Sequence, residues 1–183
     1  MSETTAMEQT ASDSRQEASL GGGLGARLAG KYMTFKLANE EYGLEILRVR
    51  EIIGLMDITR VPKTQDFVRG IINLRGKVIP VIDLKLKFGM IRTEATDQTV
   101  IIVVQVQAGD RDLTMGMLVD EVLEVLDIAE DQIEPPPNFG TENIDTKFIL
   151  GVGKEQKRVI FLLDIAKVLT VQEIEQMAAT ATT

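Results

Sequence analysis

Two apolar runs joined by a polar turn make up the stretch Phe67-Val68-Arg69-Gly70-Ile71-Ile72-Asn73-Leu74-Arg75-Gly76-Lys77-Val78-Ile79-Pro80-Val81-Ile82-Asp83-Leu84. The pattern recurs in weaker form, with no gap, 81 residues later, where Gly151 and Asp164 stand in the places of Gly70 and Asp83. This recurrence indicates that the chain carries the same hairpin twice.

A second echo lies upstream, at a spacing of 73 residues, and relates Gly43 to Gly116 and Glu51 to Glu124. Two echoes in the same order predict that one supersecondary module is duplicated. The copies differ at the hairpin turn, which reads Asn-Leu-Arg-Gly in the first copy and is expected to be a longer polar loop, 154–157, in the second. Exposed turns often carry function, so the first turn is a candidate site.

The spacing of the apolar runs predicts the fold class. Short strands every 8–12 residues or so, with turn signals between them, are typical of sheets or barrels. About five strands per copy fit a small closed barrel, which leaves no exposed sheet edge. The chain is therefore expected to be mainly β, with two five-stranded β-barrels from an internal duplication, short helices and a C-terminal helix. Strand exchange between the two modules stays open.

Composition predicts where the modules begin and end. Residues 1–30 are rich in Ser, Thr, Ala and Gly, which is typical of a disordered tail. The first β-barrel module is expected at 31–92 and the second at 97–168, joined by a short polar connection. Residues 169–183 are expected to form a C-terminal helix and tail.

Several local signals predict individual elements. The β-branched run 100–106 predicts a strand that is buried on both faces. Asp83 and Asp164 are expected to cap short helices at 84–88 and 165–169, because a carboxylate can accept hydrogen bonds from the first free backbone N–H groups of a helix.

Three further local signals predict helix starts and the place of one strand. Thr170-Val171-Gln172-Glu173 has the spacing of a capping box and predicts a helix that continues to about Ala179. Thr64 is expected to cap another short helix, 64–68. Pro80 lacks a backbone N–H, so the strand that contains it is expected to lie at a sheet edge or to bulge there.

Charge and composition exclude several classes of protein. The 183 residues carry a net charge of −8, and this negative charge does not favour binding to nucleic acid or to anionic lipid. No apolar run reaches about 18 residues, so no membrane span is expected, and the beginning of the chain lacks the apolar centre of a signal peptide. The absence of cysteine excludes disulfides and fits a reducing compartment such as the cytoplasm.

The missing residue types argue against catalysis. The chain has no histidine, cysteine or tryptophan, and all four serines lie within its first 19 residues. The folded body therefore has no serine or cysteine nucleophile, no imidazole base and no Cys/His zinc site. The acidic residues between Asp120 and Glu134 lack the Asp/Asn alternation around a central glycine that a calcium loop needs, so neither a metal nor a cofactor is expected. The alternative is a small β-barrel enzyme that uses Asp, Glu or Lys in the groove between the barrels.

Candidate binding residues are clearest at the first hairpin turn. Arg75 follows Leu74 there, and an apolar side chain beside a guanidinium is the composition of a binding anchor. Glu51 is interpreted as a charge at the rim of an exposed Ile52. Phe139, after three prolines, is expected either to tuck against the body or to anchor a partner.

These motifs together resemble a known family. The resemblance covers about residues 31–180 and rests on Glu41-Tyr42-Gly43, Val49-x-Glu51-Ile52, Phe67-Val68-x-Gly70, Asn73-Leu74-Arg75-Gly76, Val78-Ile79-Pro80-Val81-x-Asp83-Leu84, and Gly116 with Val119-Asp120 and Val122. The chain is similar to the CheW family of bacterial chemotaxis adaptors and to the CheW-like regulatory domain of the histidine kinase CheA. The resemblance implies a pair of five-stranded Src-homology-3-like barrels, in agreement with the duplication.

The resemblance also implies a function. Family members are non-catalytic scaffolds that couple the cytoplasmic tips of transmembrane chemoreceptors to CheA and support signalling arrays. The implied partners are thus the CheA regulatory domain and the receptor tips, with no nucleic acid and no direct membrane insertion, and the implied location is the cytoplasm, at membrane receptor arrays. Neither a kinase segment nor a receiver domain is recognised in the chain, so it does not resemble CheA itself or the CheV variant.

The resemblance also implies which residues contact the partners, because their positions match those in the family motifs. Glu51, Ile52, Gly70 and Arg75 fall where family members meet the receptor tip. Val49 and Phe139 are expected to contact the kinase or neighbouring barrels in the ring.

Overall fold

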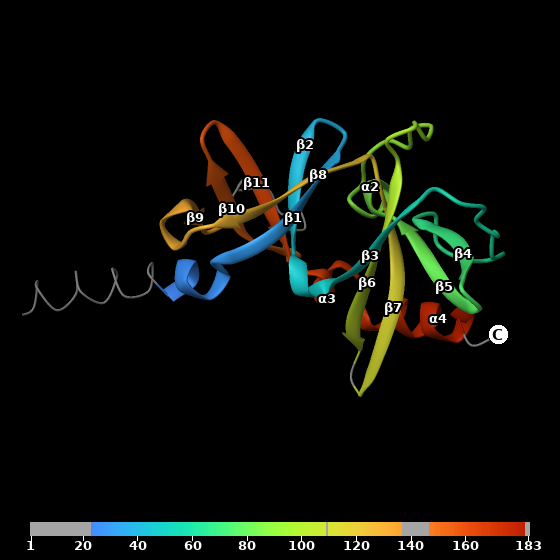
Figure 1. Cartoon of the computed structure of the whole chain (residues 1–183). Helices are drawn as coiled ribbons and strands as arrows, with labels where there is room; N and C mark the ends of the chain where they lie inside the picture. The colour runs from blue at the N-terminus through green and yellow to red at the C-terminus, as the bar shows by residue number, and fades with distance from the viewer. Residues whose placement is uncertain (1–22, 109, 137–146, 182–183) are drawn as a thin grey trace, which may run out of the picture.

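The computed structural model describes residues 23–108, 110–136 and 147–181. Two sheets lie side by side (Figure 1). The six-stranded sheet, in the order β8-β1-β2-β11-β10-β9, forms barrel A, and the five-stranded sheet, in the order β3-β6-β7-β5-β4, forms barrel B. The strands of barrel A are β1 (Gly30–Leu37), β2 (Glu40–Glu45), β8 (Glu121–Ile128), β9 (Ile133–Glu134), β10 (Ile149–Glu155) and β11 (Arg158–Leu163). The strands of barrel B are β3 (Val49–Gly54), β4 (Val68–Leu74), β5 (Lys77–Asp83), β6 (Val100–Ala108) and β7 (Arg111–Val119).

The two copies of the module exchange their first hairpins. Hairpin β1–β2 of the first copy pairs with β8 and β11 of the second, and hairpin β6–β7 of the second pairs with β3 and β5 of the first. The two parallel pairings are equivalent, because Val81 lies opposite Gly116 and Leu162 lies opposite Gly43. Neither expected segment, 31–92 or 97–168, forms a barrel from its own strands alone.

The chain crosses between the barrels at two places. It passes from β2 to β3 through the 3-10 helix η1 (Ile46–Arg48), and it returns from β7 to β8 at Asp120. The Asp120 carboxylate accepts a hydrogen bond of 2.7 Å from the backbone N–H of Ala38 and forms an ion pair of 2.6 Å with Lys85, which is only 5% exposed. Asp120 thereby ties the exchanged β1–β2 hairpin of barrel A to the body of barrel B.

Three hydrophobic clusters stabilise this arrangement. One small cluster fills barrel B and another fills barrel A. The largest cluster lies between the barrels and takes buried side chains from both sheets and from the helices. Strand β6 shows the division: Ile101 and Val103 face the inside of barrel B, whereas Ile102 and Val104 face the shared cluster. The expectation of a strand buried on both faces is confirmed, and because burial of apolar surface is the dominant favourable term in folding, the shared cluster makes the two barrels one body.

Helices follow the last strand of each copy, α2 after β5 and both α3 and α4 after β11. Helix α2 (Leu84–Lys87) begins at Asp83, whose carboxylate accepts hydrogen bonds from the N–H groups of the next turn, and α3 (Ile165–Val168) begins at Asp164 in the same way. Helix α4 (Val171–Ala181) lies below β5 (Figure 1).

The capping box that opens α4 is confirmed. The N–H of Glu173 donates to the hydroxyl of Thr170 at 3.2 Å, and the N–H of Thr170 donates to the carboxylate of Glu173 at 2.8 Å. Glu173 also forms an ion pair of 2.8 Å with Lys87 of α2, so the cap joins α4 to barrel B.

Three local expectations are wrong. Residues 64–67 form a loop with a turn at 66–67 and not a helix, and Val68 begins β4. A helical segment at 23–28 lies within the expected tail, whose residues 1–22 lie outside the described part. The second copy's hairpin turn is as short as the first, because Glu155 pairs with Arg158 across two residues. The expectation for Pro80 is confirmed locally: β5 pairs with β7 only from Val81 onward, so at Pro80 the strand has a neighbour on the β4 side alone.

Candidate functional site: two exposed surfaces on paired barrels

The first hairpin turn presents Arg75 to solvent. Arg75 has φ of 52° and Gly76 has φ of 86°, so both central residues of this two-residue turn are left-handed, which matches the twist of the flanking strands. The side-chain carbonyl of Asn73 accepts a hydrogen bond of 2.9 Å from the N–H of Gly76 and supports the turn. The Arg75 side chain is 72% exposed, and its guanidinium forms an ion pair with Glu51 of β3. Two of the predicted site residues therefore lie in direct contact.

Apolar side chains are exposed on the same barrel. Ile52 is 41% exposed beside Glu51 on β3, and Leu55 and Val78 are 45% and 38% exposed. Leu74, which was expected to stand out at the turn, is instead partly buried against the small cluster inside barrel B. Apolar side chains beside a charge pair offer a partner both contact area and directional hydrogen bonds, so Ile52 with Arg75 and Glu51 define what we call the barrel B surface.

Barrel A has a similar arrangement, in which Arg158 stands at the position of Lys77 and not of Arg75. Val125 and Val159, which stand at the positions of Ile52 and Val78 in the second copy, are each 50% exposed. Arg158 forms ion pairs of 2.9 Å with Glu41 and 2.7 Å with Glu124. These hydrogen bonds, with Glu41 first, raise the pKa of Arg158. The sequence contained a signal for this arrangement, since Glu124 stands at the position of Glu51 in the second copy.

Gly70 does not form part of an exposed surface. It is buried in a β-bulge, with φ of +139°, and a Cβ atom added there would lie 2.1 Å from the carbonyl oxygen of Thr59. Two backbone hydrogen bonds of 2.8 Å join Thr59 to Ile71 and hold this close approach. Gly70 therefore positions the loop before β4, and a partner would meet that loop and not Gly70 itself.

Val49 and Phe139 are the two residues expected to contact the kinase or neighbouring barrels. Val49 is half-buried and packs against the cluster between the barrels, opposite Val104 of β6. Phe139 lies outside the described residues.

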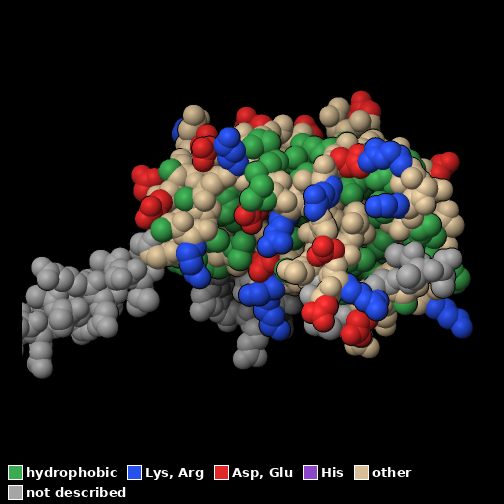
Figure 2. Space-filling view, turned by 60° about the horizontal axis from the view of Figure 1, so that its bottom comes forward, with side chains coloured by type: hydrophobic (Ala, Val, Ile, Leu, Met, Phe, Trp, Pro, Cys, Tyr) green, Lys and Arg blue, Asp and Glu red, His purple; other side chains and the backbone are tan. Residues whose placement is uncertain are grey.

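The largest cluster of apolar side chains lies between the barrels, where the catalytic alternative places its groove. Within the described residues no three Cys, His, Asp or Glu side chains are grouped to hold a metal ion. Figure 2 shows one face of the molecule, on which acidic and basic side chains alternate with hydrophobic ones. None of the helices in the described ranges is long and apolar enough to cross a membrane.

Comparison with known proteins shows which family the chain is similar to. The family model described as CheW-like domain matches residues 31–173. The chain is 38% identical over 150 residues to the chemotaxis protein CheW of Klebsiella aerogenes, covering 82% of this chain and 87% of that protein. It is 32% identical over 139 residues to the chemotaxis protein CheW of Helicobacter pylori, covering 76% and 81%. A crystal structure of the scaffolding protein TtCheW from Thermoanaerobacter tengcongensis is similar with a TM-score of 0.70 and 39% identity, over 80% of this chain and 96% of that one. The expected pair of Src-homology-3-like barrels is confirmed.

Proposed function

The chain belongs to the CheW family, and from this premise we propose that it couples the cytoplasmic tips of chemoreceptors to the regulatory domain of the kinase CheA. As a member of this family it is a chemotaxis scaffold and not an enzyme. The observation that carries the finer proposal is the barrel B surface, where β3 exposes Ile52 next in sequence to Glu51, the ion-pair partner of Arg75. An exposed apolar side chain and a charge pair on one barrel suit a helical partner that presents both kinds of group.

Coupling requires two surfaces that can be occupied together. We assign the receptor tip to the barrel B surface, with Glu51, Ile52 and Arg75 in contact and Gly70 acting through the loop that it positions. We assign the kinase, or a neighbouring barrel of the ring, to the region of Phe139, with Val49 contributing from the cluster between the barrels. One face of a small barrel offers about 800 Å² to a partner, so each contact alone is modest and is strengthened by the effective concentration within an array.

The proposed function also implies where the protein acts in the cell and how its chain is divided into domains. We place the protein in the cytoplasm, recruited to receptor arrays at the membrane by its partners. We treat 31–180 as one CheW-like domain, preceded by a tail and ended by the C-terminal helix, because the exchanged hairpins and the shared cluster leave neither copy a complete barrel of its own.

Replacing Arg75 with glutamate tests the receptor contact. The charge reversal should weaken binding to the receptor tip several-fold or more, because the acid on the partner that matches Arg75 is then repelled. The free energy of unfolding should fall by no more than about 1 kcal/mol, since the lost Arg75–Glu51 pair is solvent-exposed. Kinase activation at limiting adaptor and thermal unfolding measure the two effects.

The second copy supplies a matched control. Gln156 occupies the equivalent turn position, with φ of 54° against 52° at Arg75. Gln156→Glu should leave kinase activation unchanged. Undiminished activation by Arg75→Glu would contradict the receptor assignment, and a large fall in its melting temperature would make Arg75 a structural residue instead.

A further inference from the structure

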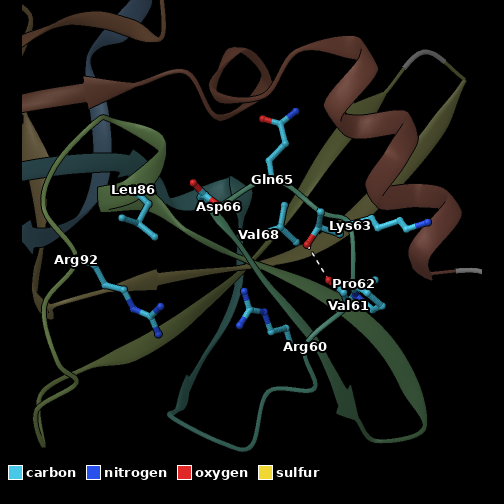
Figure 3. Close-up of a pocket in the computed structure, with 10 residues that line it drawn as sticks. Arg60, Val61, Pro62, Lys63, Gln65, Asp66, Val68, Leu86 and Arg92 are labelled. Carbon is cyan, nitrogen blue, oxygen red and sulfur yellow. Dashed lines mark hydrogen bonds between the residues drawn. The ribbon is translucent and has the colours of Figure 1, made fainter.

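A wide pocket opens on barrel B, partly walled by the loop that Gly70 positions, and its lining residues do not include Glu51, Ile52 or Arg75. Its volume is about 710 Å³, and its walls come from the loop between β3 and β4, from α2 and from the segment after α2. In Figure 3 the side chains of Arg60 and Arg92 extend into the same space from two different segments. Residues 32 positions apart in the sequence thus bring their guanidinium groups to one site.

The pocket is basic, although the chain carries a net charge of −8. Arg60, Lys63 and Arg92 line it, and Asp66 is the one carboxylate among the lining residues. Within the described ranges, no acidic side chain forms an ion pair with Arg60 or Arg92. Neither guanidinium is therefore paired directly with a described carboxylate, although Asp66 lies in the same pocket.

A third arginine adds to the charge. Arg69 of β4 lies 3.7 Å from Asp83, but the carboxylate of Asp83 also accepts hydrogen bonds from the N–H groups of Lys85 and Leu86 at the start of α2. Burial lowers the pKa of Arg69, and repulsion by Arg92 and, more weakly, by Arg60 lowers it further, against the attraction of Asp83. Like charges so close together repel each other in the free protein, and an anion between them would remove that repulsion.

We propose that this pocket binds an acidic segment of a partner protein, whose carboxylates are received by Arg60 and Arg92. The proposal rests on the scaffold function proposed above and adds a second contact to barrel B. The planar guanidinium groups can each bind a carboxylate through two parallel hydrogen bonds, which fixes the orientation of the segment as well as holding it. An acidic partner is otherwise repelled by the net charge of the chain, so a local basic pocket also directs its approach.

The walls of the pocket favour a protein segment over a small organic ligand. Small-molecule sites are mostly apolar, with a few polar groups for orientation. Here charged and polar side chains predominate, and no aromatic ring lines the pocket. The pocket is also linked to the barrel B surface, because Arg60 follows Thr59, whose backbone hydrogen bonds hold it against Ile71 beside Gly70. A partner seated on that surface has the loop within reach.

The test is an NMR titration of the full chain, labelled with ¹⁵N, with a hexaglutamate peptide at low ionic strength. Amide shifts should concentrate in the loop that carries Arg60 and in the segment around Arg92. The double variant Arg60→Glu/Arg92→Glu should bind the peptide at least about tenfold more weakly, since it loses two charge-assisted contacts. Both side chains are exposed, so its melting temperature should remain close to that of the unaltered chain.

A control with the same change in net charge separates the pocket from general electrostatics. Arg111→Glu/Lys157→Glu alters two exposed cations elsewhere and should reduce the affinity less than twofold, or about 0.4 kcal/mol. Equal losses in the two double variants, shifts centred outside the pocket, or no binding would overturn the proposal. Tight binding of inorganic pyrophosphate without binding of hexaglutamate would also overturn it, in favour of a small-anion site. Because no receptor or kinase is present in the titration, its failure would leave the coupling function untouched.

Discussion

Replacing Gly70 with alanine is expected to lower the free energy of unfolding by about 3 kcal/mol or more. The new Cβ atom would lie 2.1 Å from the carbonyl oxygen of Thr59, and backbone cannot move aside as cheaply as a flexible side chain. The φ of +139° adds strain, because side-chain-bearing residues rarely adopt it. Urea unfolding measures the loss, and receptor binding should fall with it, because the loop 55–67 loses its attachment to β4.

Two other glycines provide a graded control for this prediction. Gly54, at the end of β3, has no atom within 4 Å of an added Cβ, so Gly54→Ala should change the free energy of unfolding by no more than about 1 kcal/mol. Gly151, the counterpart of Gly70 in the second copy, would place a Cβ atom 3.0 Å from the carbonyl oxygen of Glu134, and Gly151→Ala should have an intermediate effect. A fully stable Gly70→Ala protein that no longer binds the receptor would make Gly70 a direct contact and would contradict the structural role.

Replacing Ile52 with aspartate is expected to weaken binding to the receptor tip at least about tenfold. The aspartate would place a second carboxylate beside Glu51 and would have to lose its water in an apolar contact. The Ile52 side chain is 41% exposed in the free protein, so the free energy of unfolding should change by no more than about 1 kcal/mol. Affinity for receptor-tip fragments, measured by titration calorimetry beside thermal unfolding, tests both statements.

The duplicated module again supplies the control. Val125 stands at the equivalent position in barrel A and is 50% exposed. Val125→Asp introduces the same group in the same structural setting and should leave receptor affinity unchanged. If Ile52→Asp and Val125→Asp weaken receptor binding equally, the assignment of the receptor to barrel B is wrong.

The sequence predicted the repeated unit well because local patterns define it. The β-branched run of β6 was predicted to be buried on both faces, and the Thr170–Glu173 capping box was predicted to open the last helix; both are confirmed. The exposure of Arg75 follows from its place in a two-residue turn. Each of these features depends on residues within one strand, one turn or one helix end.

The sequence did not reveal the exchange of hairpins or the sites that depend on it. Since Gly43 and Gly116 occupy equivalent positions, either hairpin offers the same close approach to the strand beside it, and local patterns cannot say which pairing is formed. The contact of Arg158 with Glu41 spans 117 residues and exists only because β2 lies beside β11. The basic pocket was missed for a related reason, since Arg60 and Arg92 come from separate irregular segments with no motif.

Co-sedimentation of all three components tests most directly whether the protein bridges receptor and kinase. Receptor-bearing membranes are mixed with the CheA regulatory domain, with or without the full chain, and the pellet is analysed. We predict that the regulatory domain sediments only when the chain is present. With Ile52→Asp both proteins should remain in the supernatant as a complex, whereas with Phe139→Ala the chain should sediment without the regulatory domain. Displacement of the chain from the membranes by the regulatory domain would contradict the account, because it would mean that the two partners compete for one surface.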